Sequence, residues 1–117
     1  MPAFDDVRRL ALELPEVEEV LTWGSDVTFR VRGRIFAIGG DGATAVSIKA
    51  SLEEQADLLA LDPETFSRAA YVGRFGWVVV QLGRVPEGHL RELLTSAWRR
   101  TAPKRLREAL PTDVQRG

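Results

Sequence analysis

The stretch DVTFRVRGRIFAI, residues 26–38, decides the fold of this 117-residue chain. Every second residue of its first half is apolar: Val27, Phe29 and Val31. An extended strand places such residues on one of its two sides, so the pattern predicts a half-buried β-strand. Gly33 with Arg34 can form a tight turn, because glycine readily adopts the positive φ that short hairpin loops need. IFAI then returns, and the stretch therefore predicts an antiparallel β-hairpin.

The segments on either side extend this hairpin into a sheet with helices around it. TAVSIK (44–49) alternates again and predicts a third strand, while AAYVGRFGWVVVQLG (69–83) predicts a second hairpin whose buried strand is GWVVVQL. Apolar residues at helical spacing predict helices over 4–14, 51–62 and 85–100, with a short one over 103–110. Ser51 and Glu54 form a capping-box pattern at the start of the second helix.

The resulting order is α-β-β-β-α-β-β-α, in which strands form hairpins instead of alternating singly with helices. We therefore expect an α+β fold of two layers, an antiparallel sheet of about five strands with helices packed mainly on one face. The other face would be open to solvent. Its outward residues would include Thr28, Arg30, Arg32 and Lys49. No linker or repeat divides the chain, so we expect one domain over residues 1–117 with an ordered core at about 3–110.

The composition excludes several kinds of chemistry. The chain has no cysteine, which removes disulfides, thiolate metal sites and cysteine nucleophiles. Its one histidine, His89, falls in the first turn of a predicted helix, where a solvated surface side chain is expected. We therefore predict no metal, no cofactor and no enzymatic activity. The chain also has neither a long apolar segment nor a signal-peptide pattern, so we expect a cytoplasmic protein without membrane contact.

Basic residues gather near the end of a chain whose formal net charge is only −1. Five of them lie between Arg99 and Arg107 with no acidic residue among them. Cations at the end of a helix complement its dipole, and exposed cations can simply be solvated. The alternative is a surface that follows a phosphate backbone. Trp98 falls on the apolar side of its helix, so we expect core packing from it instead of base stacking, and Trp77 is expected to anchor its strand.

Three stretches resemble the MmcQ/YjbR-like family: VTFRVRGRIFAI (27–38), VSIKAS (46–51) and GWVVVQLGRVPEGHLRELLTSAW (76–98). With the leading helix, the resemblance spans about residues 4 to 110. It implies a compact domain of the secretion-chaperone-like kind, in small bacterial proteins of unknown function that are commonly labelled DNA-binding. Lys49, Trp77 and Ser96 occupy positions that look typical of the family. Members usually carry a tyrosine after that serine, where this chain has Ala97 and then Trp98.

The function hypothesis is sequence-tolerant DNA binding through a C-terminal basic surface. Its predicted backbone contacts are Arg74, Arg99, Arg100, Lys104 and Arg105, with Lys49 and Arg34 as further contributors. The tips at Gly33-Arg34 and Gly73-Arg74 would act as two wings along a duplex. A second hypothesis is a non-catalytic protein-interaction or chaperone-like module, able to dimerise, with an exposed apolar patch on the open sheet. A third is a small-ligand pocket around Trp23, Tyr71 and Trp77.

Overall fold

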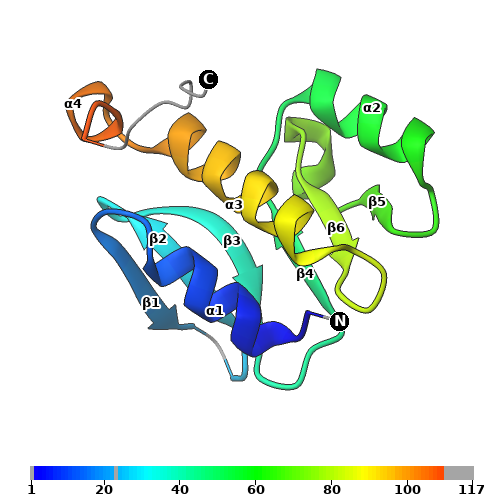
Figure 1. Cartoon of the computed structure of the whole chain (residues 1–117), viewed down its shortest axis with the longest axis horizontal. Helices are drawn as coiled ribbons and strands as arrows, with labels where there is room; N and C mark the ends of the chain where they lie inside the picture. The colour runs from blue at the N-terminus through cyan, green and yellow to red at the C-terminus, as the bar shows by residue number, and fades with distance from the viewer. Residues whose placement is uncertain (1, 23, 110–117) are drawn as a thin grey trace.

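A computed structural model describes residues 2–22 and 24–109, and its arrangement confirms the α+β prediction (Figure 1). The helices are α1 (Phe4–Leu12), α2 (Leu52–Leu61), α3 (Glu87–Thr101) and α4 (Lys104–Arg107), with a 3₁₀ turn η1 (Val72–Phe75). The strands are β1 (Val17–Leu21), β2 (Val27–Val31), β3 (Arg34–Gly39), β4 (Ala45–Ile48), β5 (Phe66–Arg68) and β6 (Val78–Gln81). No helix within these residues is both long and apolar enough to cross a membrane.

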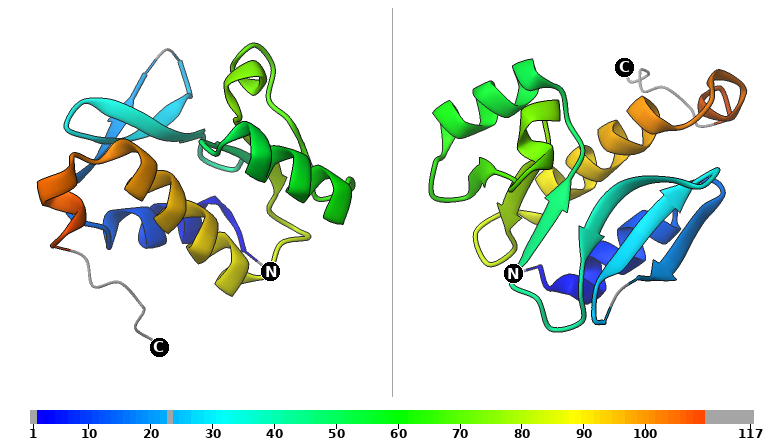
Figure 2. Two further views of the ribbon diagram at one scale, coloured as in Figure 1. Left: turned by 90° about the horizontal axis from the view of Figure 1, so that it is seen from above. Right: turned by 180° about the vertical axis from the view of Figure 1, so that it is seen from behind.

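Within these residues six strands form one antiparallel sheet in the order β1-β2-β3-β4-β6-β5. The predicted hairpin of residues 26–38 is β2 and β3, and its pairing contains a bulge at Phe29/Arg30. The helices α1 and α3 lie side by side on one face of the sheet (Figure 2, left), while the strands β1, β2 and β3 are uncovered when seen from behind (Figure 2, right). The predicted two layers and open face are therefore both present.

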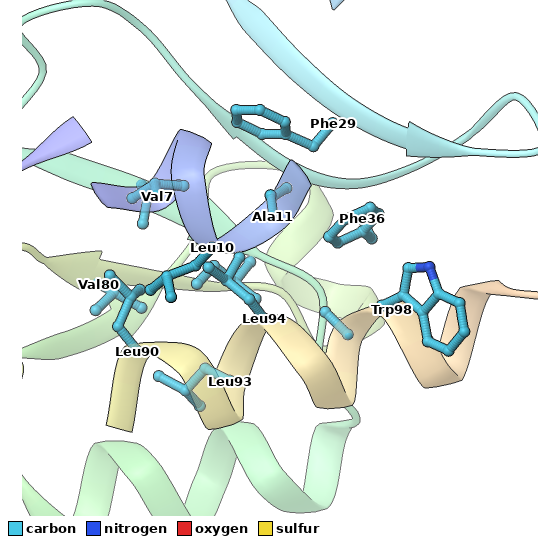
Figure 3. Packing of buried hydrophobic residues seen from close by; sticks show 14 of the residues in the cluster. Val7, Leu10, Ala11, Phe29, Phe36, Val80, Leu90, Leu93, Leu94 and Trp98 are labelled. Carbon is cyan, nitrogen blue, oxygen red and sulfur yellow. The ribbon is translucent and has the colours of Figure 1, made fainter. Parts of the chain in front are cut away.

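The core fills the space between the sheet and the helices α1 and α3 (Figure 3). Leu90 and Leu94 of α3 are buried with Leu10 of α1, as the helical spacing of these residues predicts. Trp98 is completely buried, and its indole Nε1–H donates a hydrogen bond to the carbonyl oxygen of Pro15 at 3.0 Å. The prediction that Trp98 packs in the core is confirmed.

The strand β1 is a sixth strand that the sequence did not predict. Its segment, VEEVL, carries two glutamates and lacks the regular alternation of β2. It lies at the edge of the sheet and pairs only with β2. Glu19 accepts a hydrogen bond from Arg8 of α1 at 2.9 Å. One of the two glutamates of β1 therefore connects the strand to the helix layer. Charged side chains at an exposed edge also discourage pairing with a further strand.

The second hairpin differs from its prediction in where its first strand lies. Residues 62–65 form a turn, β5 follows at once, and residues 69–77 connect β5 to β6 through η1. The side chain of Gln55 donates to the carbonyl oxygens of Gly73 and Trp77, both at 2.8 Å. The carbonyl of Trp77 also accepts from the backbone N–H of Ala69 at 3.3 Å, and that of Gly73 accepts from the N–H of Gly76 at 3.0 Å. The side chain of α2 thus holds the connecting segment where the pairing of β5 with β6 ends.

Candidate nucleic-acid interface

The turn between β2 and β3 fixes the position of Arg34. Arg32 and Gly33 have φ values of 51° and 79°, the two consecutive positive values of a hairpin turn that matches the twist of its strands. Arg34 is the first residue of β3, and its side chain is exposed. The guanidinium of Arg34 forms no hydrogen bond or ion pair with any residue in the described part of the chain. The predicted turn is present, one residue earlier than expected.

The end of α3 positions Arg99 and Arg100. The helix ends at Thr101 because Ala102, which precedes Pro103, adopts an extended conformation with ψ of 147°. Arg100 forms an ion pair from its Nη2 to Oε1 of Glu54 on α2 at 3.0 Å. Both arginines lie in the last turn of the helix, where positive charge is favoured by the dipole.

A shallow groove of about 290 Å³ brings the hairpin turn and the end of α3 together. Its walls are formed by Arg32, Arg34, Arg100, Thr101, Ala102 and Pro103. Two predicted site residues that are far apart in the sequence, Arg34 and Arg100, therefore line one depression. Arg32 also lines the groove. The alternation along its strand predicts instead that Arg32 belongs to the outward residues of the sheet. Its position beside Gly33 in the turn is the signal that could have identified it.

Lys104 and Arg105 continue the basic surface beyond this groove. They follow Pro103 directly as the first residues of α4, and both are exposed. Within residues 2–22 and 24–109 neither side chain has a hydrogen-bond or ion-pair partner. Arg107 turns back instead and donates to the carbonyl oxygen of Arg99 at 3.3 Å. We use the name basic end for the following five residues: Arg34, Arg99, Arg100, Lys104 and Arg105.

Lys49 and Arg74 are not walls of this groove. Lys49 nevertheless lies beside β3, because its backbone N–H donates to the carbonyl oxygen of Phe36 at 3.0 Å. Lys49 is half-buried and follows β4, and Arg74 belongs to η1, where its guanidinium carbon lies 4.8 Å from the centre of the Phe75 ring. The expected hairpin tip at Gly73-Arg74 is thus a 3₁₀ turn, because the carbonyl of Gly73 is held by Gln55. Of the seven predicted cations, the groove therefore brings together Arg34 and Arg100.

Carboxylates moderate the charge of the groove. Oε1 of Glu16 accepts from Nε of Arg32 at 2.6 Å, and this hydrogen bond holds the pKa of Glu16 below its ordinary value. Glu54 is the partner of Arg100. Three members of the basic end have side chains with neither a hydrogen bond nor an ion pair within the described residues: Arg34, Lys104 and Arg105. The surface can therefore hold an anion at its unpaired cations without first breaking an ion pair.

The aromatic residues of the predicted ligand site do not form one site, and the single histidine packs against a neighbouring ring. Trp77 is 8% exposed and anchors the start of β6, as predicted, whereas Tyr71 is 93% exposed. These two side chains are not walls of one enclosed pocket, and Trp23, the third member of the predicted ligand site, lies outside the described residues. His89 is half-buried, and its ring meets the edge of Phe66 with the centroids 5.5 Å apart. No group of three metal-ligating side chains occurs in the described ranges.

Comparison with known proteins identifies the relatives of the fold. A family model described as YjbR matches residues 12–100. The crystal structure of Deinococcus radiodurans protein DR2400, described by the family-model domain DUF419, is similar with a TM-score of 0.80 and 26% sequence identity. The similarity covers 95% of this chain and 91% of that one. No curated protein matches the sequence.

Proposed function

Because this chain belongs to the YjbR family, we propose that its function resides in the surface that this fold assembles, and that the basic end binds the phosphate backbone of DNA without reading sequence. The proposed function is binding, without a chemical step. Arg34, Arg100, Lys104 and Arg105 are the proposed phosphate contacts, and Arg99 supports them from the last turn of α3. Lys49 and Arg74 are not walls of the groove, so this set of contacts does not include them.

The observation that carries the proposal is the groove lined by both Arg34 and Arg100. A chain of net charge −1 attracts a polyanion only where its cations are gathered in space. The groove gathers cations from the β2–β3 turn and the end of α3, and two exposed cations of α4 follow it. Arginine and lysine that neutralise phosphates release counterions, which makes such binding salt-dependent.

The test is fluorescence anisotropy of a labelled DNA duplex across a salt series. Four phosphate contacts predict a slope of log affinity against log salt of about −3.6, from about −0.9 for each phosphate. The double variant Lys104→Glu, Arg105→Glu should lose binding while its far-ultraviolet circular dichroism spectrum stays that of the parent.

The matched control is Arg84→Glu with Arg91→Glu. This double variant makes the same change of net charge, but its residues lie in the β6–α3 connection and in the first half of α3. Their ion pairs with Glu64 and Glu13 are exposed, so their loss should change stability little. If both double variants weaken binding equally, net charge is responsible and the assignment to the basic end is wrong.

A protein-interaction module is the second candidate, and the open face of the sheet favours it. The strand register aligns Val20, Thr28, Ile38, Ser47 and Val79 in one row across five strands. Val20, Ile38 and Val79 are each half-buried, so this uncovered face is partly apolar. Sedimentation of the parent and of Ile38→Lys at high concentration tests it: a dimer that this substitution dissociates would favour the interaction module over the DNA-binding proposal.

A further inference from the structure

Two aromatic side chains stand in solvent on the connection between β5 and β6. Tyr71 is 93% exposed and Phe75 is 62% exposed. Both belong to residues 69–77, which we call the aromatic loop. The basic end does not include them, and neither contributes to the buried core.

The backbone of this loop is held firmly from below. Gln55 is only 5% exposed, and its side-chain amide donates to the carbonyls of Gly73 and Trp77. Gly76, with φ of 104°, packs so closely that a Cβ there would lie 2.6 Å from the carbonyl oxygen of Ala50. The loop is thus preorganised, and a ligand that contacts its side chains does not have to order its backbone.

The conformation of Tyr71 points to a role for its ring outside the core. Its φ of 63° and ψ of −62° form a γ-turn, in which the N–H of Val72 donates to the carbonyl oxygen of Ala70 at 2.6 Å. This turn is strained for a residue with a side chain. Glycine would occupy the position with less strain, and burial of the ring does not offset the strain because the ring is in solvent.

Two arginines, Arg68 and Arg74, lie beside or within the aromatic loop. The guanidinium of Arg74 lies over the ring of Phe75, and the side chain of Arg68 lies along Gly73, where a Cβ would be 3.3 Å from its own. The sequence has no acidic residue from position 65 to position 86. Exposed rings beside cations are the two features that bind single-stranded nucleic acid, the rings by stacking on bases and the cations through phosphates.

The aromatic loop is also connected to the basic end. Gly76 lies against Ser51 and Leu52 at the start of α2, and Glu54 in the first turn of α2 pairs with Arg100. In Figure 1 the start of α2, the end of α3 and α4 follow one edge of the molecule. A strand bound at the loop can therefore continue along this edge to the basic end.

We propose that the aromatic loop is a stacking platform for unpaired bases, with Tyr71 and Phe75 as the stacking residues, so that the preferred ligand is single-stranded nucleic acid. The inference rests on the proposed function, since the phosphates of the same strand would contact the basic end. Bases inside a duplex already stack on one another, so a duplex uses only the basic end.

The experiment compares a labelled single-stranded oligonucleotide with the matching duplex by anisotropy. The variant Tyr71→Leu, Phe75→Leu keeps apolar side chains of similar size but removes both rings, and Tyr71→Phe, Phe75→Tyr keeps the rings. We expect the leucine variant to bind the single strand at least about tenfold more weakly, since stacking on each of the two rings contributes at least about fivefold. Its duplex affinity and its salt slope should match the parent, and the ring-keeping variant should match the parent on both ligands. Leu61→Ala, at an exposed apolar position at the other end of α2, is the surface control.

The outcomes separate this inference from the proposed function. If the leucine variant binds the single strand like the parent while Lys104→Glu, Arg105→Glu loses the duplex, the platform is wrong and the basic end stands. Equal weakening on both ligands also overturns the platform, because the loop then acts without unpaired bases. If the parent binds neither ligand at low salt, both proposals fail.

Discussion

Trp98 is the residue at which burial and hydrogen bonding act together. Its ring is fully buried, and its N–H satisfies the carbonyl oxygen of Pro15 just after α1. Trp98→Ala should cost about 3–5 kcal/mol, because it leaves a cavity and removes that donor. Trp98→Phe keeps most of the burial and should cost less. Urea unfolding followed by far-ultraviolet circular dichroism measures both, and a loss below about 1 kcal/mol for the alanine variant would contradict the packing described.

Gly76 and Gly33 both have positive φ, but their surroundings differ. A Cβ at Gly76 would lie within 2.9 Å of the backbone of Ala50, Ser51 and Leu52, none of which can move aside as a side chain could. At Gly33 the same Cβ meets nothing within 4 Å. We expect Gly33→Ala to cost about 1–2 kcal/mol from strain alone, and Gly76→Ala to cost more than about 3 kcal/mol. Thermal unfolding of the two variants makes the comparison, and equal losses would show that close packing at Gly76 adds nothing.

Single residues were predictable where one local rule decides their environment. The helical spacing that places Trp98 beside Leu94 is sufficient to predict its burial. Thr28 shows the limit, since it was expected on the open face and is only 3% exposed. Arg30, two residues along the same strand, bends over it and donates to its hydroxyl at 3.0 Å. A contact of this kind depends on side-chain conformation, which alternation along a strand does not specify.

At the scale of elements, the start of α2 is stabilised by a serine cap. Oγ of Ser51 accepts from the backbone N–H of Glu54 at 2.9 Å, which is the serine half of the predicted capping box. The carboxylate of Glu54 instead reaches Arg100. Ser51→Ala should therefore cost about 1 kcal/mol, as is usual for the loss of such a cap.

Glu54→Ala is the matched variant for this cap. It removes a partly exposed ion pair and should cost less than Ser51→Ala. Chemical denaturation of both variants ranks them, and a larger loss for Glu54→Ala would mean that the contact between α2 and α3 matters more than the cap.

Helices and strands were predictable where an apolar periodicity extends over many residues. They were less predictable where contacts with other elements determine the local structure. The strands β2, β3, β4 and β6 and the helices α1, α2 and α3 follow from their patterns. The strand β1 forms because β2 offers an edge to pair with and Arg8 offers a partner to Glu19, neither of which is visible within its five residues. For the same reason, η1 depends on Gln55 of a different element.

At the scale of the whole molecule, the sequence could show which residues are basic but not which of them meet. Arg34 and Arg100 share a groove only because β3 lies beneath α3, and this follows from the order of strands in the sheet. The same order places Lys49 beside Phe36 of β3, whereas Arg74 lies on η1 between β5 and β6. Proximity along the chain predicted Arg99, Arg100, Lys104 and Arg105 as neighbours, but proximity across the sheet requires the complete topology.

Carboxylates spread over the molecule predict how its stability responds to acid. A hydrogen bond from the backbone N–H of Ala3 lowers the pKa of Asp6, one from the Arg32 guanidinium lowers that of Glu16, and one from the hydroxyl of Thr65 lowers that of Asp62. In each case the folded protein binds its proton less readily than the unfolded chain. Their contribution to stability is therefore complete above the unfolded pKa values of about 4, and it is lost as the pH falls through the lower folded values.

We expect the urea midpoint of unfolding to fall progressively below about pH 4. Asp62→Asn gives the sharper test, because asparagine has no charge to titrate. It keeps one oxygen that can accept from the backbone N–H of Glu64, while an NH2 group replaces the oxygen that accepts from Thr65. Its midpoint should fall less steeply with acid than that of the parent, while the two curves run parallel above about pH 5. An identical acid dependence in both proteins would mean that the depressed pKa of Asp62 does not contribute, and a midpoint that rises on acidification would contradict the sign of the whole argument.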